Sequence, residues 1–237
     1  MEITQHHKTA LLFGASGLVG GQCLHQLLEH PAYRKVISFG RRKLEVEHPQ
    51  LEQHVIDFDR LEEYAGLLKG HDLYSCLGTT MAKAGSRKAF FRVDFTYAFE
   101  SARLAASQGA RQLLLVSSVG ASPEALFFYP RVKGELEAAV KKLPFWAVHI
   151  FQPSFLVGSR EESRLGEQLA GRLSLGLDRL TGGALLGKYR PVEAAQVARA
   201  MIHAAQRLEG GTHVYPSGQI HELAGEDNQT ITKRQNI

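Results

Sequence analysis

The sequence predicts an α/β fold in which a doubly wound parallel sheet is covered by helices on both faces. Two observations support this prediction. Short apolar runs, typical of buried strands, alternate along the chain with segments whose apolar residues recur at helical spacing. The run Gln112–Ser117 is almost wholly apolar, as expected of a strand covered on both faces. With 237 residues, 44% of them hydrophobic, the chain is long enough to bury a substantial core.

Up to residue 151, the chain contains six apolar runs that we interpret as strands. They are, in order, Thr9–Phe13, Lys35–Phe39, Gln53–Phe58, Asp72–Leu77, Gln112–Ser117 and Trp146–Phe151. Between them lie segments with apolar residues at helical spacing, namely Leu18–Leu28, Leu61–Leu68, Phe90–Ser107 and Arg131–Lys142. Each of these segments is followed closely by a proline or a glycine, residues that end helices.

The pattern loosens after Pro153. There we expect a helix, a glycine-rich loop, a second helix and a late strand, at Glu161–Leu173, Ser174–Lys188, Val192–Arg207 and Thr212–Tyr215 respectively. Residues 1–225 are therefore expected to form one domain. Within it, a small C-terminal region at about 153–190 is expected to form a substrate pocket, and residues 226–237 are expected to be a polar tail.

Composition and charge argue against several functional classes. The net charge is only +4, and the densest basic cluster, Arg41-Arg42-Lys43, is too short for a nucleic-acid-binding surface. The two cysteines and 11 histidines show no metal-ligand spacing. No segment approaches the ~20 apolar residues that span a bilayer, and no apolar leader precedes the first strand. We therefore expect a cytoplasmic protein that binds no metal, nucleic acid or membrane.

A glycine-rich turn, Gly14-x-x-Gly17-x-x-Gly20, joins the first expected strand to the first expected helix. Glycine is needed where the backbone turns tightly or approaches a pyrophosphate, and the N–H groups at a helix start favour negative charge. The spacing differs from the G-x-G-x-x-G form, so an ordinary strand-to-helix turn stays an alternative. Together with the alternating elements, the turn predicts a Rossmann-type sheet that binds a nucleotide.

The end of the second expected strand indicates which dinucleotide would bind. NAD-binding proteins place an acidic residue there, which accepts hydrogen bonds from the ribose hydroxyls. This chain instead has Arg41 and Arg42, and no carboxylate occurs before Glu45. Guanidinium groups suit a phosphate dianion, so these residues favour NADP(H) over NAD(H). A solvated basic turn is the alternative.

Two other strand ends are candidate cofactor contacts. At the end of the third strand, Asp57 is placed to accept a hydrogen bond from the adenine amino group, and capping a turn is an equally good interpretation. Leu77, Gly78 and Thr79 follow at the end of the fourth strand. A glycine there allows a cofactor ribose to approach the carboxyl edge of the sheet.

Tyr129 and Lys133 are candidate catalytic residues because residues four apart share one face of a helix. A phenol has a pKa near ~10, and a nearby ammonium favours the phenolate and lowers that pKa. Ser118, at the end of the fifth strand, supplies a hydroxyl that would polarise a substrate carbonyl. The tyrosine–lysine spacing also occurs by coincidence. Because Pro130 follows Tyr129, the helix is expected either to begin no earlier than about Leu126 or to kink at the proline.

Several stretches together resemble the short-chain dehydrogenase/reductases of the atypical kind, and more closely their Tat-interacting-protein-like oxidoreductase branch. The resembling stretches are GASGLVG, ISFGRRKL, VIDF, LEEYAGLLKGHDLYSCLGTT, KAG, VDFTYAFESARLA, LLLVSSVGAS, FFYPRVKGELEA and FQPSFLVGSREESRLGE. They extend from about residue 10 to about residue 205. The resemblance implies a Rossmann fold, NADPH binding and a catalytic tyrosine–lysine pair.

The resemblance also implies roles for individual residues. Those expected to line the pyrophosphate are Ser16, Gly17, Leu18 and Val19. Arg41 and Arg42 would hold the 2′-phosphate, Leu77 and Gly78 would border the ribose, and Tyr129 and Lys133 would be the catalytic pair. Leu156 and Arg164 would contact the nicotinamide side or the mouth of the pocket.

These features lead to three functional hypotheses. The first is an NADPH-dependent reductase or dehydrogenase that acts on a carbonyl or alcohol as a monomer or homodimer. The second is an NADPH-loaded regulatory protein that reports redox state to a partner. The tyrosine–lysine pair favours the enzyme, because some regulators with this fold lack that pair. A nucleotide-sugar epimerase is a third hypothesis, although the arginine pair argues against NAD and the region after Pro153 is short for a sugar-nucleotide domain.

Overall fold

The computed structural model describes residues 3–157 and 190–225. Within these ranges, a 7-stranded sheet has the order β3-β2-β1-β4-β5-β6-β9, and neighbouring strands are parallel throughout. The strands are β1 (Lys8–Phe13), β2 (Tyr33–Gly40), β3 (Leu51–Val55), β4 (Asp72–Ser75), β5 (Gln112–Val116), β6 (Ala147–Gln152) and β9 (Gly211–Pro216). A separate parallel pair consists of β7 (Leu156–Val157) and β8 (Val192–Glu193).

Helices connect the strands and cover the sheet. The α-helices are α1 (Leu18–Glu29), α2 (Met81–Ala84), α3 (Arg87–Phe91), α4 (Ala98–Ser107), α5 (Phe128–Val140), α8 (Ala194–Arg207) and α9 (Ser217–Gly225). Two further helical segments are η1 (Phe58–Leu67), which is a 3-10 helix, and η2 (Arg92–Tyr97), which is a π-helix. Segments α3, η2 and α4 follow one another directly in the chain.

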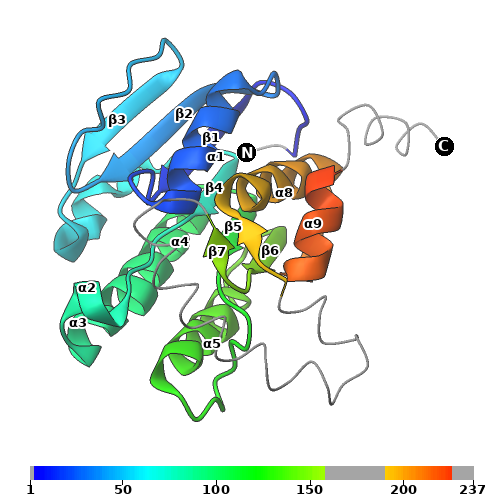
Figure 1. Cartoon of the computed structure of the whole chain (residues 1–237). Helices are drawn as coiled ribbons and strands as arrows, with labels where there is room; N and C mark the ends of the chain where they lie inside the picture. Colours follow the sequence, from blue (N-terminus) through cyan, green and yellow to red (C-terminus); the bar gives the residue numbers. More distant parts are fainter. Residues whose placement is uncertain (1–2, 158–189, 226–237) are drawn as a thin grey trace.

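Two hydrophobic clusters lie on opposite faces of the sheet. One contains buried residues of α1, α8 and α9, such as Leu27, Met201 and Ile220. The other contains residues of η1, α4 and α5, such as Leu61 and Leu136. Figure 1 shows α1 and α8 on one side of the sheet and α4 and α5 on the other. The expected doubly wound Rossmann-type sheet with helices on both faces is confirmed.

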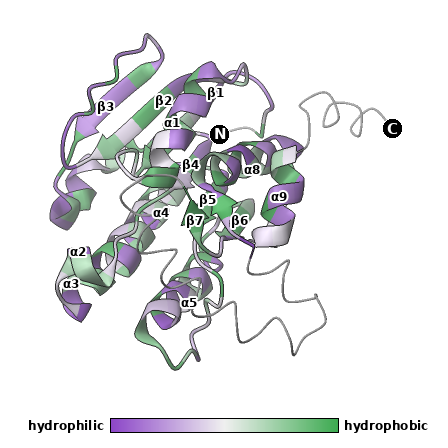
Figure 2. Cartoon of the chain, viewed as in Figure 1, coloured by the Kyte–Doolittle hydropathy of each residue, from purple (hydrophilic) through white to green (hydrophobic). Residues whose placement is uncertain are grey.

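The burial of the strands follows from this layering. Central strands such as β5 have nearly all residues buried, whereas the edge strand β3 is half-buried. Figure 2 correspondingly shows β3 as largely hydrophilic. The strand order changes direction between β1 and β4, since β2 and β3 lie on one side of β1 and the later strands lie on the other. In such sheets, ligands bind in the crevice at the carboxyl ends of the two strands where the order changes.

Several expected elements have different bounds in the structure. The third strand is Leu51–Val55 and not Gln53–Phe58, because Asp57 ends the extended segment by accepting the Asp59 backbone N–H at 2.9 Å and capping η1. The expected helix Leu61–Leu68 is this 3-10 segment, which begins earlier. The fourth strand ends at Ser75, before the expected Leu77.

The two helices near the expected catalytic residues also begin earlier than predicted. The long helix begins at Arg87, where the Ser86 hydroxyl caps it, and its middle is π-helical. Helix α5 begins at Phe128 and not at Arg131, so that Pro130 lies in its first turn, where a missing N–H is tolerated. The helix start agrees with the limit set by Pro130.

Some elements were not expected, and some expectations fall outside the described ranges. Helices α2 and α9 and the short strands β7 and β8 have no counterpart in the prediction. The expected helix Glu161–Leu173, the expected loop Ser174–Lys188 and the expected polar tail 226–237 lie outside the described residues. Of the helices described, none is long and apolar enough to cross a membrane.

Candidate functional site

The glycine turn after β1 depends on close backbone packing. Gly14 has φ +85°, and a Cβ there would lie 2.4 Å from the carbonyl oxygen of Cys76. A Cβ on Gly20 would lie 2.0 Å from the carbonyl oxygen of Gly14. Both contacts are with backbone atoms, which no rotamer change relieves. Glycine at these two positions therefore allows α1, the turn and the segment after β4 to pack together.

Helix α1 begins without a side-chain cap. Its N-cap is Gly17, whose backbone N–H donates to the carbonyl oxygen of Gly14 at 2.9 Å, and no side chain satisfies the first N–H groups of the helix. Free N–H groups at a helix start, together with the helix dipole, form an anion-binding position. This arrangement fits the pyrophosphate of a dinucleotide.

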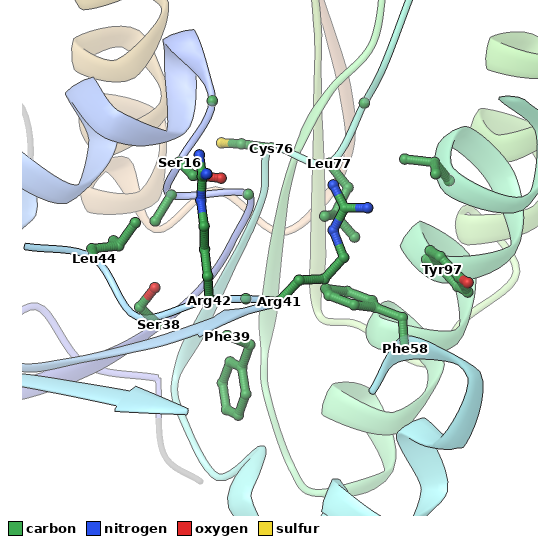
Figure 3. A pocket seen from close by; sticks show the side chains of 16 residues that line it. Ser16, Ser38, Phe39, Arg41, Arg42, Leu44, Phe58, Cys76, Leu77 and Tyr97 are labelled. Carbon is green, nitrogen blue, oxygen red and sulfur yellow. The ribbon is translucent and has the colours of Figure 1, made fainter. Parts of the chain in front are cut away.

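A pocket opens where three strands end at one edge of the sheet (Figure 3). The turn Gly14–Gly17 follows β1, Arg41 and Arg42 follow β2, and the segment Cys76–Gly78 follows β4. These ends coincide because Phe13 pairs with Phe39 of β2 and with Ser75 of β4. The pocket thus occupies the topological switch point of the sheet.

Arg41 and Arg42 bring positive charge to this pocket. Figure 3 shows both side chains rising from the end of β2 into the opening that Ser16 and Leu77 border. In the described part of the chain, neither guanidinium has a carboxylate within ion-pair distance. None of the described residues that line the pocket is acidic. The lining suits a phosphate better than a pair of ribose hydroxyls.

The other expected dinucleotide contacts fall into two groups. Leu77 and Gly78 line the pocket along with Gly14, Ser16 and Gly17. Leu18, Val19 and Gly20 belong to the first turn of α1 and do not line it; Val19 and Gly20 are buried. Thr79 also lies outside the lining, and its backbone N–H donates to the Asp94 carboxylate at 2.8 Å.

Asp57 and Leu156 are not brought to the pocket lining. Asp57 caps η1, so the geometry favours the turn-capping interpretation, while the neighbouring Phe58 is the residue that lines the pocket. Leu156 is 37% exposed and pairs with Val192 in the small second sheet. Arg164 lies outside the described residues.

Helix α5 brings Lys133 to the border of the pocket. The Lys133 side chain is buried, and its Nζ lies 2.8 Å from Oδ1 of Asp94. A Cβ placed on the pocket residue Gly78 would lie 3.6 Å from Lys133 Nζ and 3.4 Å from Asp94 Oδ1. Lys133 and Asp94 therefore lie directly behind the glycine that the sequence assigns to the ribose.

The protonation state of Lys133 follows from its neighbours. Burial lowers the pKa of the ammonium, but the Asp94 carboxylate, with contributions from Tyr129 and Glu137, outweighs burial and raises the pKa above its ordinary value. Lys133 is therefore charged at neutral pH, as a residue that stabilises a phenolate must be.

Tyr129 and Ser118 differ in exposure. Tyr129, one turn before Lys133, is 39% exposed, and its ring packs 5.5 Å from that of Phe90. Ser118 is buried, and its Oγ has no hydrogen-bond partner among the described residues. Its neighbour Ser117 instead donates to Glu137 at 2.5 Å. A buried hydroxyl without a partner fits a role in binding a ligand oxygen.

Some site residues were missed by the sequence analysis. Asp94 contacts the predicted lysine, and Cys76, Phe58, Val93 and Tyr97 line the pocket. The available signal for Asp94 was a carboxylate within a helical segment rich in apolar residues. In the described part of the chain, no group of His, Cys, Asp and Glu side chains could hold a metal ion.

Comparison with known proteins identifies relatives over most of the chain. The chain is 42% identical over 173 residues to HTATIP2 of Rattus norvegicus, and the aligned region covers 71% of this chain and 71% of that protein. It is 32% identical over 223 residues to the mitochondrial protein fmp52 of Aspergillus clavatus, covering 91% and 94% of the two chains. No protein-family model matches the chain.

Solved structures share the fold at low sequence identity. An oxidoreductase of the short-chain dehydrogenase/reductase family from Burkholderia thailandensis has a TM-score of 0.63 and 16% identity, over 98% of each chain. MoeE5 in complex with UDP-glucuronic acid and NAD has a TM-score of 0.66 and 16% identity, over 87% of this chain and 75% of that one. These neighbours bear out the Rossmann-type fold.

The relatives correct one expectation. The fmp52 proteins of Aspergillus clavatus and Candida albicans are named mitochondrial, which contradicts the cytoplasmic location expected from the sequence. That expectation was wrong because it rested on a search for apolar segments, which bears on secretion and membrane insertion alone. Mitochondrial import signals are amphipathic and arginine-rich, not apolar.

Proposed function

Because the chain belongs to the Tat-interacting-protein-like branch of the short-chain dehydrogenase/reductases, we propose that it is an NADPH-dependent oxidoreductase acting on a small carbonyl or alcohol substrate. One observation chiefly supports the proposal. The buried Lys133 ammonium borders, behind Gly78, a pocket into which two arginines without ion-pair partners among the described residues project. One member of the candidate catalytic pair, Lys133, thus lies beside the pocket that the two arginines enter.

The residues at the phosphate end suit NADPH. The N–H groups at the start of α1 would hold the pyrophosphate, and the turn Gly14–Gly17 allows it to approach the backbone. Arg41 and Arg42 would bind the 2′-phosphate through charge-assisted hydrogen bonds. A 2′-hydroxyl, as in NADH, would leave these guanidinium groups without an anion.

The residues at the other end suit proton transfer. When bound, NADPH supplies a hydride to the carbonyl carbon of the substrate. The Tyr129 hydroxyl would donate its proton to the carbonyl oxygen, and Ser118 Oγ would donate a hydrogen bond to the same oxygen. Lys133 would bind the ribose hydroxyls, and its charge would stabilise the phenolate left on Tyr129.

The enzyme proposal is tested by following NADPH consumption against a panel of aldehydes and ketones. With a compound that is turned over, Tyr129→Phe should lower kcat by about 100-fold or more, since general acid catalysis contributes at least that factor. Its Kd for NADPH should be unchanged. Tyr64→Phe removes a phenol from η1, on a different element from Lys133, so it is the matched control and should keep full activity.

The outcomes separate the enzyme from the regulatory protein. NADPH binding without turnover of any compound would favour the regulator. Full activity in Tyr129→Phe would exclude Tyr129 as the proton donor. Turnover that requires Tyr129 would establish the reductase.

A further inference from the structure

Asp94 is a fully buried carboxylate, with one oxygen in an ion pair and the other in a hydrogen bond at the candidate site. Oδ1 lies 2.8 Å from Lys133 Nζ, and Oδ2 accepts the backbone N–H of Thr79 at 2.8 Å. Thr79 follows the pocket residue Gly78, and Lys133 belongs to α5. A single side chain therefore links the segment after β4 to the helix with the candidate catalytic pair.

The backbone that positions Asp94 is unusual. Asp94 lies in η2, the π-helical segment Arg92–Tyr97, between Val93 and Tyr97, which both line the pocket. π-helical turns within α-helices are rare and are frequent at functional sites. Outside the pocket, the Asp59 carboxylate supports the segment by accepting hydrogen bonds from Arg92 at 2.8 Å and from Tyr97 at 2.6 Å.

Lys133 depends on Asp94 for a counter-ion. Among the described residues, the charged or titratable groups that act on Lys133 are Asp94 from η2 and Tyr129 and Glu137 from its own helix. Glu137 is already engaged, because it accepts hydrogen bonds from Ser117 at 2.5 Å and from Gln152 at 2.9 Å. The segment after β4 presents the backbone of Gly78 and Thr79, which have no charge. Removing one partner of a buried ion pair leaves the other charge uncompensated.

We propose that Asp94 is a positioning residue of the dinucleotide site, which keeps Lys133 charged and directs its ammonium toward the ribose beside Gly78. The inference rests on the proposed function, because it concerns the role of Lys133 toward a bound dinucleotide. Asp94 acts through Lys133 and through Thr79, and it takes no proton from the substrate. Its carboxylate is the reason that burial does not neutralise the lysine.

The test is the pH dependence of NADPH binding in Asp94→Asn. The amide oxygen of asparagine still accepts the Thr79 N–H, but the counter-ion is lost, so Lys133 should lose its proton at a lower pH. Above that pH, the charged fraction of Lys133 falls about tenfold with each further unit, and binding that requires the charge weakens in proportion. Between about pH 6 and about pH 9, the ratio of the variant Kd to the wild-type Kd should therefore rise at least tenfold.

Asp59→Asn is the matched control. It removes a carboxylate that supports the same π-helical segment without contacting Lys133, so its Kd ratio to the wild type should stay constant with pH. Taking ratios also cancels the titration of the NADPH phosphate itself. A ratio for Asp94→Asn that stays as constant as that for Asp59→Asn would overturn the proposal.

A double variant keeps the proposal testable if Asp94→Asn does not fold. Asp94→Asn with Lys133→Met removes both charges, so it should fold and unfold at a higher denaturant concentration than Asp94→Asn alone. A double variant no more stable than the single one would show that Asp94 serves only Thr79, and would overturn the proposal. Failure of the wild type to bind NADPH would instead refute the proposed function.

Discussion

Gly20→Ala should disrupt the turn that we assign to the pyrophosphate. A Cβ at position 20 would lie 2.0 Å from the carbonyl oxygen of Gly14 and 2.6 Å from its carbon. Side-chain carbons do not approach other heavy atoms closer than 3.0 Å, so the Gly14 carbonyl must move by about 1 Å (3.0 minus 2.0). Overpacking of this kind costs about 3 kcal/mol when backbone must shift.

Gly21→Ala is the matched control in the next position of the same helix. A Cβ there would lie 3.5 Å from the Ala15 carbonyl oxygen, which is an ordinary contact. Both substitutions gain about 1 kcal/mol from replacing a helical glycine. The difference between the two variants therefore isolates the steric clash. We expect Gly21→Ala to be slightly stabilised and Gly20→Ala to lose about 2 kcal/mol of unfolding free energy.

Urea unfolding and NADPH titration of the two variants measure both consequences. Moving the Gly14 carbonyl displaces the turn Gly14–Gly17, so Gly20→Ala should also bind NADPH at least about tenfold more weakly. The reasoning would be refuted if Gly20→Ala were as stable as the wild type, or if Gly21→Ala were equally damaging.

Two further predictions concern residues that stabilise the fold and take no part in the proposed reaction. Burial, reinforced by His213, Lys8 and Arg207, lowers the pKa of His149 to about 3, so His149 stays neutral in the folded protein while the unfolded chain takes up a proton below about pH 6.5. Stability should therefore fall as the pH falls from about 6.5 toward about 3, with about 2.7 kcal/mol lost by about pH 4.5. His149→Asn should remove that part of the pH dependence, and the same change at His25, whose side chain is 80% exposed, should not. Asp57→Ala should lower the unfolding free energy by about 1 kcal/mol through loss of the η1 cap, with little change in NADPH affinity. A large loss of NADPH affinity would instead support the interpretation that Asp57 contacts the adenine.

The parallel sheet was predictable because its signals are local. Apolar runs such as Gln112–Ser117 mark buried strands, and the glycine turn marks the first crossover. Residues at the carboxyl ends of neighbouring strands then meet at one edge by topology alone. Arg41, Leu77 and the glycine turn thus share a pocket, as expected.

The missed features depend on contacts between distant residues. The ion pair of Asp94 with Lys133 joins two helices that are far apart in the chain, and a π-helical segment leaves no trace in apolar periodicity. Strands β7 and β8 span two residues each, too few to produce an alternating pattern. Asp57 had two equally good interpretations in the sequence, and only the geometry of its cap distinguishes them.

The central claim, that the cleft is built for NADPH, is tested most directly by comparing the Kd values for NADPH and NADH. Charge-assisted hydrogen bonds contribute about 1.5–3 kcal/mol, so the wild type should prefer NADPH by at least about tenfold. Arg41→Ala and Arg42→Ala should each remove most of this preference. Lys43→Ala, which loses the same charge from a neighbouring residue outside this pocket lining, should retain it. Equal affinity of the wild type for NADPH and NADH would contradict the claim.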